Sequence, residues 1–225
     1  MSGREKSLVQ NFYNHLQFPG IYQADSLKTL NNAYLLTIDR ALNNKQTVLD
    51  VGCGTGLITN LFALRYPHSQ FTAIDFADSI DFAQSFAKAN QINNVQFIKQ
   101  DFDQLSTQRS YDVVICQGAL HHMPNYVDAA NKLVQLTDKT LIVGLYHPWG
   151  KLVKKWTRIN YGNDILQQDQ ENHPYERSFT ASDVIRMFAN LDLRYSYPSH
   201  INIVSHIEAL FNYKNGGLIT YVFDK

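Results

Sequence analysis

The chain has 225 residues, 44% of them hydrophobic and 12% aromatic, which is enough to bury the core of a single α/β domain. Its 20 basic and 20 acidic residues give a formal net charge of zero, and this balance argues against a dedicated nucleic-acid-binding protein. Two cysteines are too few for a disulfide-rich scaffold or a four-cysteine zinc site. We find neither a signal-type apolar segment nor a membrane span, and therefore expect a cytoplasmic protein.

Helical patterns alternate with short apolar runs along the chain. We predict helices over 27–42, 57–66, 79–90 and 127–136, and strands over 47–51, 71–74, 95–99, 111–116 and 140–145. Strands and helices in this alternation indicate parallel strands with crossover helices, which is a doubly wound sheet. The pattern then predicts a helix over 181–190, capped by Thr180 or Ser182, and strands over 191–197 and 218–223.

No linker is visible, so residues 1–225 are expected to form a single domain. Residues 1–45 form a candidate helical cap or lid, because FYNHLQFPGIY is dense in aromatic residues and Tyr13 or Tyr22 can reach a site. A helix that simply packs on the sheet is the alternative. Residues 149–179 are a candidate substrate-side insertion. Its basic residues, which attract an anion or form a solvated helix face, are Lys151, Lys154, Lys155 and Arg158.

The most specific motif is VLDVGCGTG, in which a buried strand runs into a glycine turn and then a helix. Gly52, Gly54 and Gly56 lack a Cβ atom, so the backbone can turn tightly and a ligand can lie against it. In an open α/β sheet, ligands bind beyond the carboxyl ends of the strands. The motif therefore predicts a ligand site at this turn.

Three residues around the turn indicate which ligand binds. A dinucleotide fingerprint needs G-x-G-x-x-G, but Leu57 occupies the position of the third glycine. The carboxylate of Asp50 would repel a pyrophosphate and suits a cationic amino group. Asp75 follows the second strand, where an acid can accept hydrogen bonds from ribose hydroxyls. Together they describe a nucleoside with a cationic amino-acid tail and disfavour a nicotinamide oxidoreductase.

VLDVGCGTG with Asp75 and Asp101 closely resembles the class I S-adenosylmethionine-dependent methyltransferases, in the group that includes quinone-biosynthesis and other small-molecule enzymes. The resemblance covers about residues 46–148, and the two C-terminal strands by pattern. It implies a doubly wound, seven-stranded, mostly parallel sheet of order 3-2-1-4-5-7-6, with the last strand antiparallel and helices on both faces. It also implies S-adenosylmethionine as the cofactor, S-adenosylhomocysteine as the product, and no metal.

The resemblance also implies roles for residues at the strand ends. The methionine part of the cofactor is held by Asp50 and the glycine loop, in which Cys53 contributes its backbone. Asp75 binds the ribose and Asp101 the adenine amino group, with Asp103 as the rival of Asp101. The implied cofactor-binding residues are Asp50, Gly52, Cys53, Gly54, Gly56, Asp75, Phe76, Asp101, Phe102, Gln117 and Gly118.

The segment after the fourth strand, ICQGALHHMPN, lacks the motifs of the amino-group, arginine and cytosine-5 methyltransferases, and Cys116 is expected in the core. His121 and His122 are candidate general bases, as is His147; a structural role is the alternative, because methyl transfer needs alignment more than a base. We expect direct displacement onto a small-molecule acceptor. The alternatives are a tRNA or protein methyltransferase and a catalytically inactive cofactor-binding protein.

Overall fold

The computed structural model describes residues 33–147, 177–198 and 217–225. Its elements are, in chain order, α2 (Ala33–Ala41), β1 (Thr47–Val51), α3 (Leu57–Arg65), β2 (Gln70–Asp75), α4 (Ser79–Ala89), β3 (Val95–Lys99), the 3-10 helix η1 (Phe102–Gln104), β4 (Tyr111–Gln117), the 3-10 helix η2 (Leu120–His122), α5 (Tyr126–Leu136), β5 (Thr137–His147), α8 (Ala181–Met187), β6 (Asp192–Pro198) and β7 (Gly217–Asp224). This alternation confirms the expected α/β class.

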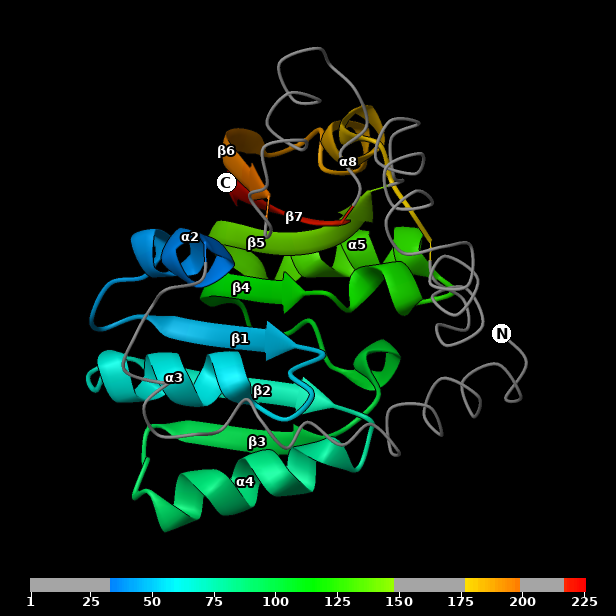
Figure 1. Ribbon diagram of the computed structural model, residues 1–225. Helices are drawn as coiled ribbons and strands as arrows, with labels where there is room; N and C mark the ends of the chain where they lie inside the picture. Colours follow the sequence, from blue (N-terminus) through cyan, green and yellow to red (C-terminus); the bar gives the residue numbers. More distant parts are fainter. Residues whose placement is uncertain (1–32, 148–176, 199–216) are drawn as a thin grey trace, which may run out of the picture.

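The seven strands form one sheet in the order β3-β2-β1-β4-β5-β7-β6. Strands β1 to β5 are parallel, and the arrowheads of β1, β2 and β4 point to the same side in Figure 1. Strand β7 runs antiparallel to both β5 and β6. The order and the antiparallel last strand implied by the resemblance are confirmed. The strand order reverses between β1 and β4, which is where open α/β sheets bind their ligands.

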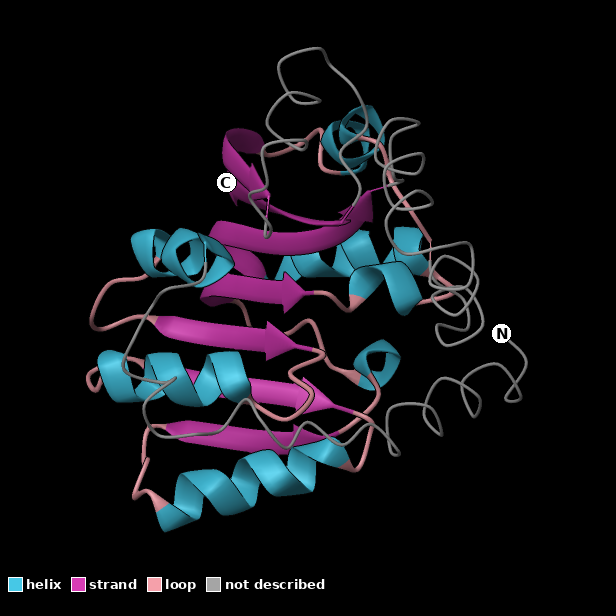
Figure 2. Ribbon diagram, viewed as in Figure 1, coloured by secondary structure: helices cyan, strands magenta, loops and turns pink. Residues whose placement is uncertain are grey.

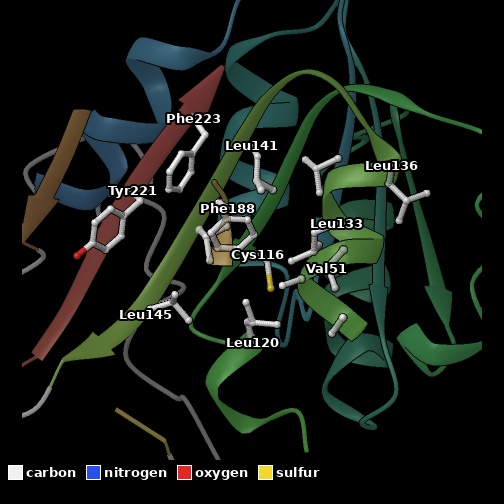
Figure 3. Close-up of a cluster of buried hydrophobic side chains, with 14 of the residues drawn as sticks. Val51, Cys116, Leu120, Leu133, Leu136, Leu141, Leu145, Phe188, Tyr221 and Phe223 are labelled. Carbon is white, nitrogen blue, oxygen red and sulfur yellow. The ribbon is translucent and has the colours of Figure 1, made fainter. Parts of the chain in front are cut away.

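Helices cover both faces of the sheet (Figure 2). Successive residues of a strand point to opposite faces, so Val48 packs with α2 and α3, whereas Leu49 packs on the side of α5 and α8. Figure 3 shows part of the cluster that contains Leu49, in which Leu133 of α5 and Phe188, the residue after α8, lie near Cys116 of β4. Strands buried on both faces read as continuous apolar runs, which is why the sequence revealed them.

Several boundaries differ from the prediction. Strand β5 is longer than 140–145, because polar residues at its start already pair with β4. Helix α8 ends before 190, and Thr180 is its N-cap: the Thr180 hydroxyl accepts from the Asp183 N–H, and the Asp183 carboxylate accepts from the Thr180 N–H. The sequence did not predict the 3-10 helices η1 and η2, which are too short to show a period.

Some predictions fall outside the described residues. They are most of the cap or lid over 1–45, of which residues 33–45 with α2 are described, and the candidate insertion over 149–179 with its basic cluster, of which only residues 177–179 are described. Tyr13 and Tyr22 belong to the same group. All of these stay predictions. Within the described ranges, no helix has both the length and the apolar character needed to cross a membrane.

Candidate functional site

A cavity of about 140 Å³ lies at the carboxyl ends of the parallel strands. Its wall is formed by the glycine loop after β1, the turn after β2, and the loops after β3 and β4. The cavity therefore sits where the strand order reverses, as expected for a ligand site in this fold. Its lining residues are Gly52, Gly54, Ile74, Asp75, Phe76, Ser79, Gln100, Asp101, Phe102, Asp103, Gly118, Ala119, His122, Met123, Pro124 and Asn125.

The glycine loop is fixed onto the end of β2. The Gly52 N–H donates to the Ile74 carbonyl at 2.9 Å, and the Gly54 N–H donates to Oδ2 of Asp75 at 2.7 Å. Gly52, Gly54 and Gly56 have φ angles of 71°, 54° and 72°. This left-handed region is readily accessible to glycine alone, so the motif's glycines are required by the path of the loop.

Asp75 both lines the cavity and supports the loop. Its Oδ1 accepts from the Ala77 N–H at 2.9 Å, while Oδ2 accepts from Gly54. Burial raises the pKa of Asp75, and the backbone donors at Ala77 and Gly54 oppose that shift. The sequence predicts Asp75 as a ligand residue but did not predict its contact with the glycine loop, because that contact forms only in the folded sheet.

Asp50 lies under the glycine loop and does not line the cavity. Its buried carboxylate accepts a hydrogen bond from the Thr59 hydroxyl of α3 at 2.5 Å. Burial raises the pKa of Asp50 to about 7; the Thr59 hydrogen bond lowers it, and the nearby Asp75 charge raises it further. Asp50 therefore connects the loop to the helix that follows it.

Cys53 and Gly56 belong to the loop but do not line the cavity. A Cβ atom on Gly56 would lie only 2.5 Å from Cβ of Ala83. Gly56 thus lets α4 pack closely against the loop. Cys53 is partly buried, and its thiol lies 3.9 Å from the Gly54 carbonyl.

The loop after β3 brings two acids and Phe102 to the cavity, and Phe76 reaches it from the turn after β2. Asp101 is the N-cap of η1, and its Oδ1 accepts from the Asp103 N–H at 3.0 Å. Both acids line the cavity, as do Phe76 and Phe102. Lys132 of α5 holds this loop from outside, because Nζ donates to the carbonyls of Phe102 and Asp103 at 2.7 and 3.0 Å and lies 5.1 Å from the Phe102 ring centre.

At the end of β4, Gly118 lines the cavity and Gln117 does not. The Gln117 amide donates to Oγ1 of Thr220 in β7 at 2.9 Å. Its side chain crosses over Gly144 of β5, where a Cβ atom would lie 2.4 Å from the amide. Gln117 therefore ties β4 to β7 across β5, a contact that depends on the sheet order.

Of the two adjacent histidines, His122 lines the cavity and His121 does not. His121 is buried, its ring 4.0 Å from that of His122 and edge-on to Tyr146 at 5.1 Å. The sequence missed Met123 and Asn125, which line the cavity just before α5. Their place between an expected strand and an expected helix was the available signal, since loops at this edge form ligand sites.

His147 and Cys116 lie away from the cavity. The Nε2 atom of His147 is 2.8 Å from the Tyr221 hydroxyl, and burial lowers the pKa of His147 to about 4, although Asp183 raises it. Burial raises the pKa of the Cys116 thiol to about 12, so a thiolate nucleophile does not form at neutral pH. Among the described residues, no cluster of His, Cys, Asp and Glu side chains could hold a metal ion.

The comparison with curated proteins returns methyltransferases. The chain is 34% identical over 113 residues to a malonyl-[acyl-carrier protein] O-methyltransferase of Bacillus anthracis, covering 49% of this chain and 41% of that protein. It is 40% identical over 90 residues to a ubiquinone biosynthesis O-methyltransferase of Rickettsia bellii, covering 39% and 36%. The chain spans about half the length of the malonyl-[acyl-carrier protein] O-methyltransferases it matches.

Among solved structures, the magnesium protoporphyrin IX methyltransferase of Synechocystis PCC 6803 with bound S-adenosylmethionine superposes with a TM-score of 0.65 at 17% identity, covering 98% of this chain and 97% of that one. This likeness shows the fold. A family model described as "Methyltransferase domain" matches residues 42–188, which include the glycine loop, both histidines and α8. The chain therefore belongs to the methyltransferase-domain family, with the fold of the class I S-adenosylmethionine-dependent enzymes.

Proposed function

We propose that this chain transfers a methyl group from S-adenosylmethionine to a small-molecule acceptor. The observation that carries the proposal is the cavity where the strand order reverses, in which the glycine loop, Asp75 and the loops after β3 and β4 meet. Membership in the methyltransferase-domain family supports it.

The cavity residues fit the proposed cofactor. A Cβ atom on Gly54 would meet nothing within 4 Å, so open space lies directly against the loop backbone. The Asp75 carboxylate at the end of β2 suits ribose hydroxyls, and Asp101 or Asp103 suits the adenine amino group. Phe76 and Phe102 offer apolar surface beside the base. The hydrogen bond from Thr59 connects Asp50 to α3 beneath the loop, and the ionised form of Asp50 favours a cationic tail.

When bound, S-adenosylmethionine supplies a sulfonium methyl group that an acceptor takes by direct displacement. The chain's own contribution is alignment of the two partners and exclusion of water. His122 is the candidate residue to receive the acceptor's proton, because its side chain lies on the cavity wall and His121 lies behind it. The reaction as proposed needs no metal.

The acceptor class and the compartment rest on composition and on the relatives. The zero net charge gives no general attraction for nucleic acid. Relatives include enzymes named for ubiquinone biosynthesis and for (S)-coclaurine N-methylation, which supports a small-molecule acceptor. Both cysteines are free thiols, which suits the reducing cytoplasm.

Binding of S-adenosylhomocysteine tests the cofactor assignment. At about 100 times its dissociation constant the ligand should stabilise the protein by roughly 2.7 kcal/mol, and NAD at the same concentration should not. Asp75→Asn should weaken binding by about tenfold or more, because the amide can replace only part of the carboxylate's acceptor capacity. Asp81→Asn, an exposed acid on α4, is the control. Stabilisation by NAD alone, or by neither ligand, would contradict the proposal.

Radiolabel transfer tests the acceptor class. Incubating the protein with labelled S-adenosylmethionine and a cell extract should place the label in the small-molecule fraction. Label in RNA or protein would instead identify a macromolecular acceptor. Cofactor binding without any transfer would favour a catalytically inactive cofactor-binding protein.

A further inference from the structure

The loop between β4 and α5 makes a large part of the cavity wall. Gly118, Ala119, His122, Met123, Pro124 and Asn125 all line the cavity. Within the loop, the His122 N–H donates to the Ala119 carbonyl at 3.0 Å and the Met123 N–H donates to the Leu120 carbonyl at 3.1 Å. A single 3-10 turn therefore shapes the loop, and its position depends on groups outside it.

From outside, the Gly118 N–H donates to the Gly144 carbonyl of β5 at 3.1 Å, and Arg177, just before α8, adds two further contacts. Its backbone N–H donates to the His121 carbonyl at 3.2 Å, and its Nη1 donates to the Met123 carbonyl at 3.0 Å. Its guanidinium carbon lies 5.3 Å from the ring centre of Tyr126, the first residue of α5. The segment that leads into α8 passes this end of α5 in Figure 1, where it is coloured yellow. One residue thus holds two carbonyls of the loop and the start of the next helix.

The segment that carries Arg177 is itself fixed to the sheet. The Phe179 N–H donates to the Tyr146 carbonyl of β5 at 2.8 Å, and the Phe179 ring meets Tyr126 edge-on at 5.1 Å. The capping box at Thr180 then fixes the start of α8. The segment 177–180 therefore connects the sheet, which it contacts through Phe179, to the cavity loop, which it contacts through Arg177.

We infer that Arg177 is a positioning residue of the methyl-donor site, acting through the Met123 carbonyl and Tyr126 to hold the cavity wall. Arg177 does not line the cavity, so its effect on a ligand is indirect. A guanidinium can donate to a carbonyl and cover an aromatic face at the same time, because it is planar and carries five N–H groups. A lysine ammonium matches only part of that arrangement. This inference rests on the proposed function for the identity of the ligand.

The test measures S-adenosylhomocysteine binding by isothermal titration in Arg177→Ala and Arg177→Lys. Arg186→Ala is the matched control, because Arg186 is an exposed arginine of the adjacent α8. We expect the alanine variant to bind about tenfold more weakly, the lysine variant to lie between it and the wild type, and the control to bind as the wild type does. Should the alanine variant not fold, the lysine variant decides alone, with a smaller loss expected.

Hydrogen exchange separates positioning from general stability. In the Arg177 variants, amides of residues 118–125 should exchange faster, while those of β1 and β4 stay as protected as in the wild type. If Arg177→Ala, or Arg177→Lys where the alanine variant does not fold, binds S-adenosylhomocysteine as tightly as the wild type, the inference is wrong. It is also wrong if amide exchange rises equally throughout the protein and Arg177→Lys does not restore the wild-type rates. If the wild type itself does not bind S-adenosylhomocysteine, the proposed function is contradicted. Amide exchange of residues 118–125 then still shows whether Arg177 positions the loop.

Discussion

Asp50 and Asp75 flank the glycine loop in the sequence and have different surroundings. Asp75 accepts the backbone N–H groups of Gly54, Ala77 and Phe76 and borders the cavity. Asp50 is buried under the loop with one hydroxyl donor, from Thr59. A buried carboxylate with a single neutral donor loses more hydration than it regains. The charge state of Asp50 is therefore the more sensitive of the two to its surroundings.

The raised pKa of Asp50 predicts a pH-dependent stability. Because this pKa moves from 3.8 to about 7 on folding, the folded protein keeps a proton that the unfolded chain has lost between these values. The free energy of unfolding should therefore fall as pH rises through this window, by up to about 1.4 kcal/mol per pH unit. Urea unfolding of the ligand-free protein at several pH values measures the slope.

Asp50→Asn should flatten that slope, because the amide does not titrate and its oxygen can still accept from Thr59. Asp75 contributes a slope of the same sign, since its pKa is also raised by burial, so some dependence should remain. The exposed Asp128→Asn is the control. Equal slopes in the wild type and Asp50→Asn would show that Asp50 ionises normally in the folded protein.

Replacing Lys132, which does not line the cavity, should nevertheless weaken ligand binding. Lys132→Met keeps an unbranched apolar chain beside Phe102 but removes the donor to the Phe102 and Asp103 carbonyls. S-adenosylhomocysteine should then bind about tenfold more weakly, because the loop after β3 loses two charge-assisted hydrogen bonds. Lys88→Met, an exposed lysine of α4, should bind as the wild type does. Unchanged affinity in Lys132→Met would mean that η1 is held without it.

At the scale of elements, the glycine loop joins the end of β1 to the start of α3 and packs closely against α4. Gly56 has φ +72°, and its Cβ position lies 2.5 Å from Ala83 and 3.0 Å from Phe97. Gly54 also has a positive φ, +54°, but faces open space within the cavity. The same motif therefore contains glycines required by packing, Gly56 and also Gly52, whose Cβ would lie 2.3 Å from Cβ of Ala119, and one, Gly54, that leaves room for a ligand.

Alanine substitutions should separate these two roles. Gly56→Ala combines a left-handed alanine, which costs about 1–2 kcal/mol, with an overlap of buried groups that costs about 1–3 kcal/mol more. Gly54→Ala carries only the backbone cost, yet its methyl group enters the cavity and should sharply reduce S-adenosylhomocysteine affinity. Urea unfolding of both variants measures the loss of stability, and titration with S-adenosylhomocysteine measures the loss of affinity. Normal affinity in Gly54→Ala would place the ligand elsewhere.

At the scale of the whole molecule, the sheet has a protected centre and two unequal edges. Strands β1 and β4 are paired on both sides and buried on both faces. Within the part of the chain that the structure describes, strand β3 pairs only with β2, and none of its residues is fully buried. Strand β6 forms the other edge, where the Tyr195 hydroxyl donates to the Thr37 carbonyl of α2 at 3.0 Å. The cavity thus borders the most stable part of the sheet.

Hydrogen exchange should follow this arrangement. Amides of β1 and β4 should exchange most slowly, near the global unfolding limit, because their exposure requires the whole sheet to open. Amides of β3 should exchange faster through local opening at the edge. Equal protection of β3 and β1 would mean that this edge does not open independently of the centre.

Much of this protein was determined by the sequence alone, because the signals were local. Continuous apolar runs such as Thr47–Val51 marked the strands, and the glycine spacing marked the turn and its ligand class. Asp75 was predicted from its place after the second strand and Asp101 from the resemblance, and both line the cavity. These features depend on residues that are neighbours in the chain.

Only the tertiary structure decided which candidates reach the cavity. His122 lines it while His121 lies behind it, and Gln117 turns away to Thr220, because side-chain direction at a strand end depends on the elements packed there. The supports of the cavity wall, Lys132 and Arg177, carry no sequence signal, since each meets its carbonyl partner across a long stretch of chain. Contacts between distant segments form only in the folded sheet. The sequence therefore indicates which kinds of residue make up the site, whereas the tertiary structure determines which of them face the cavity.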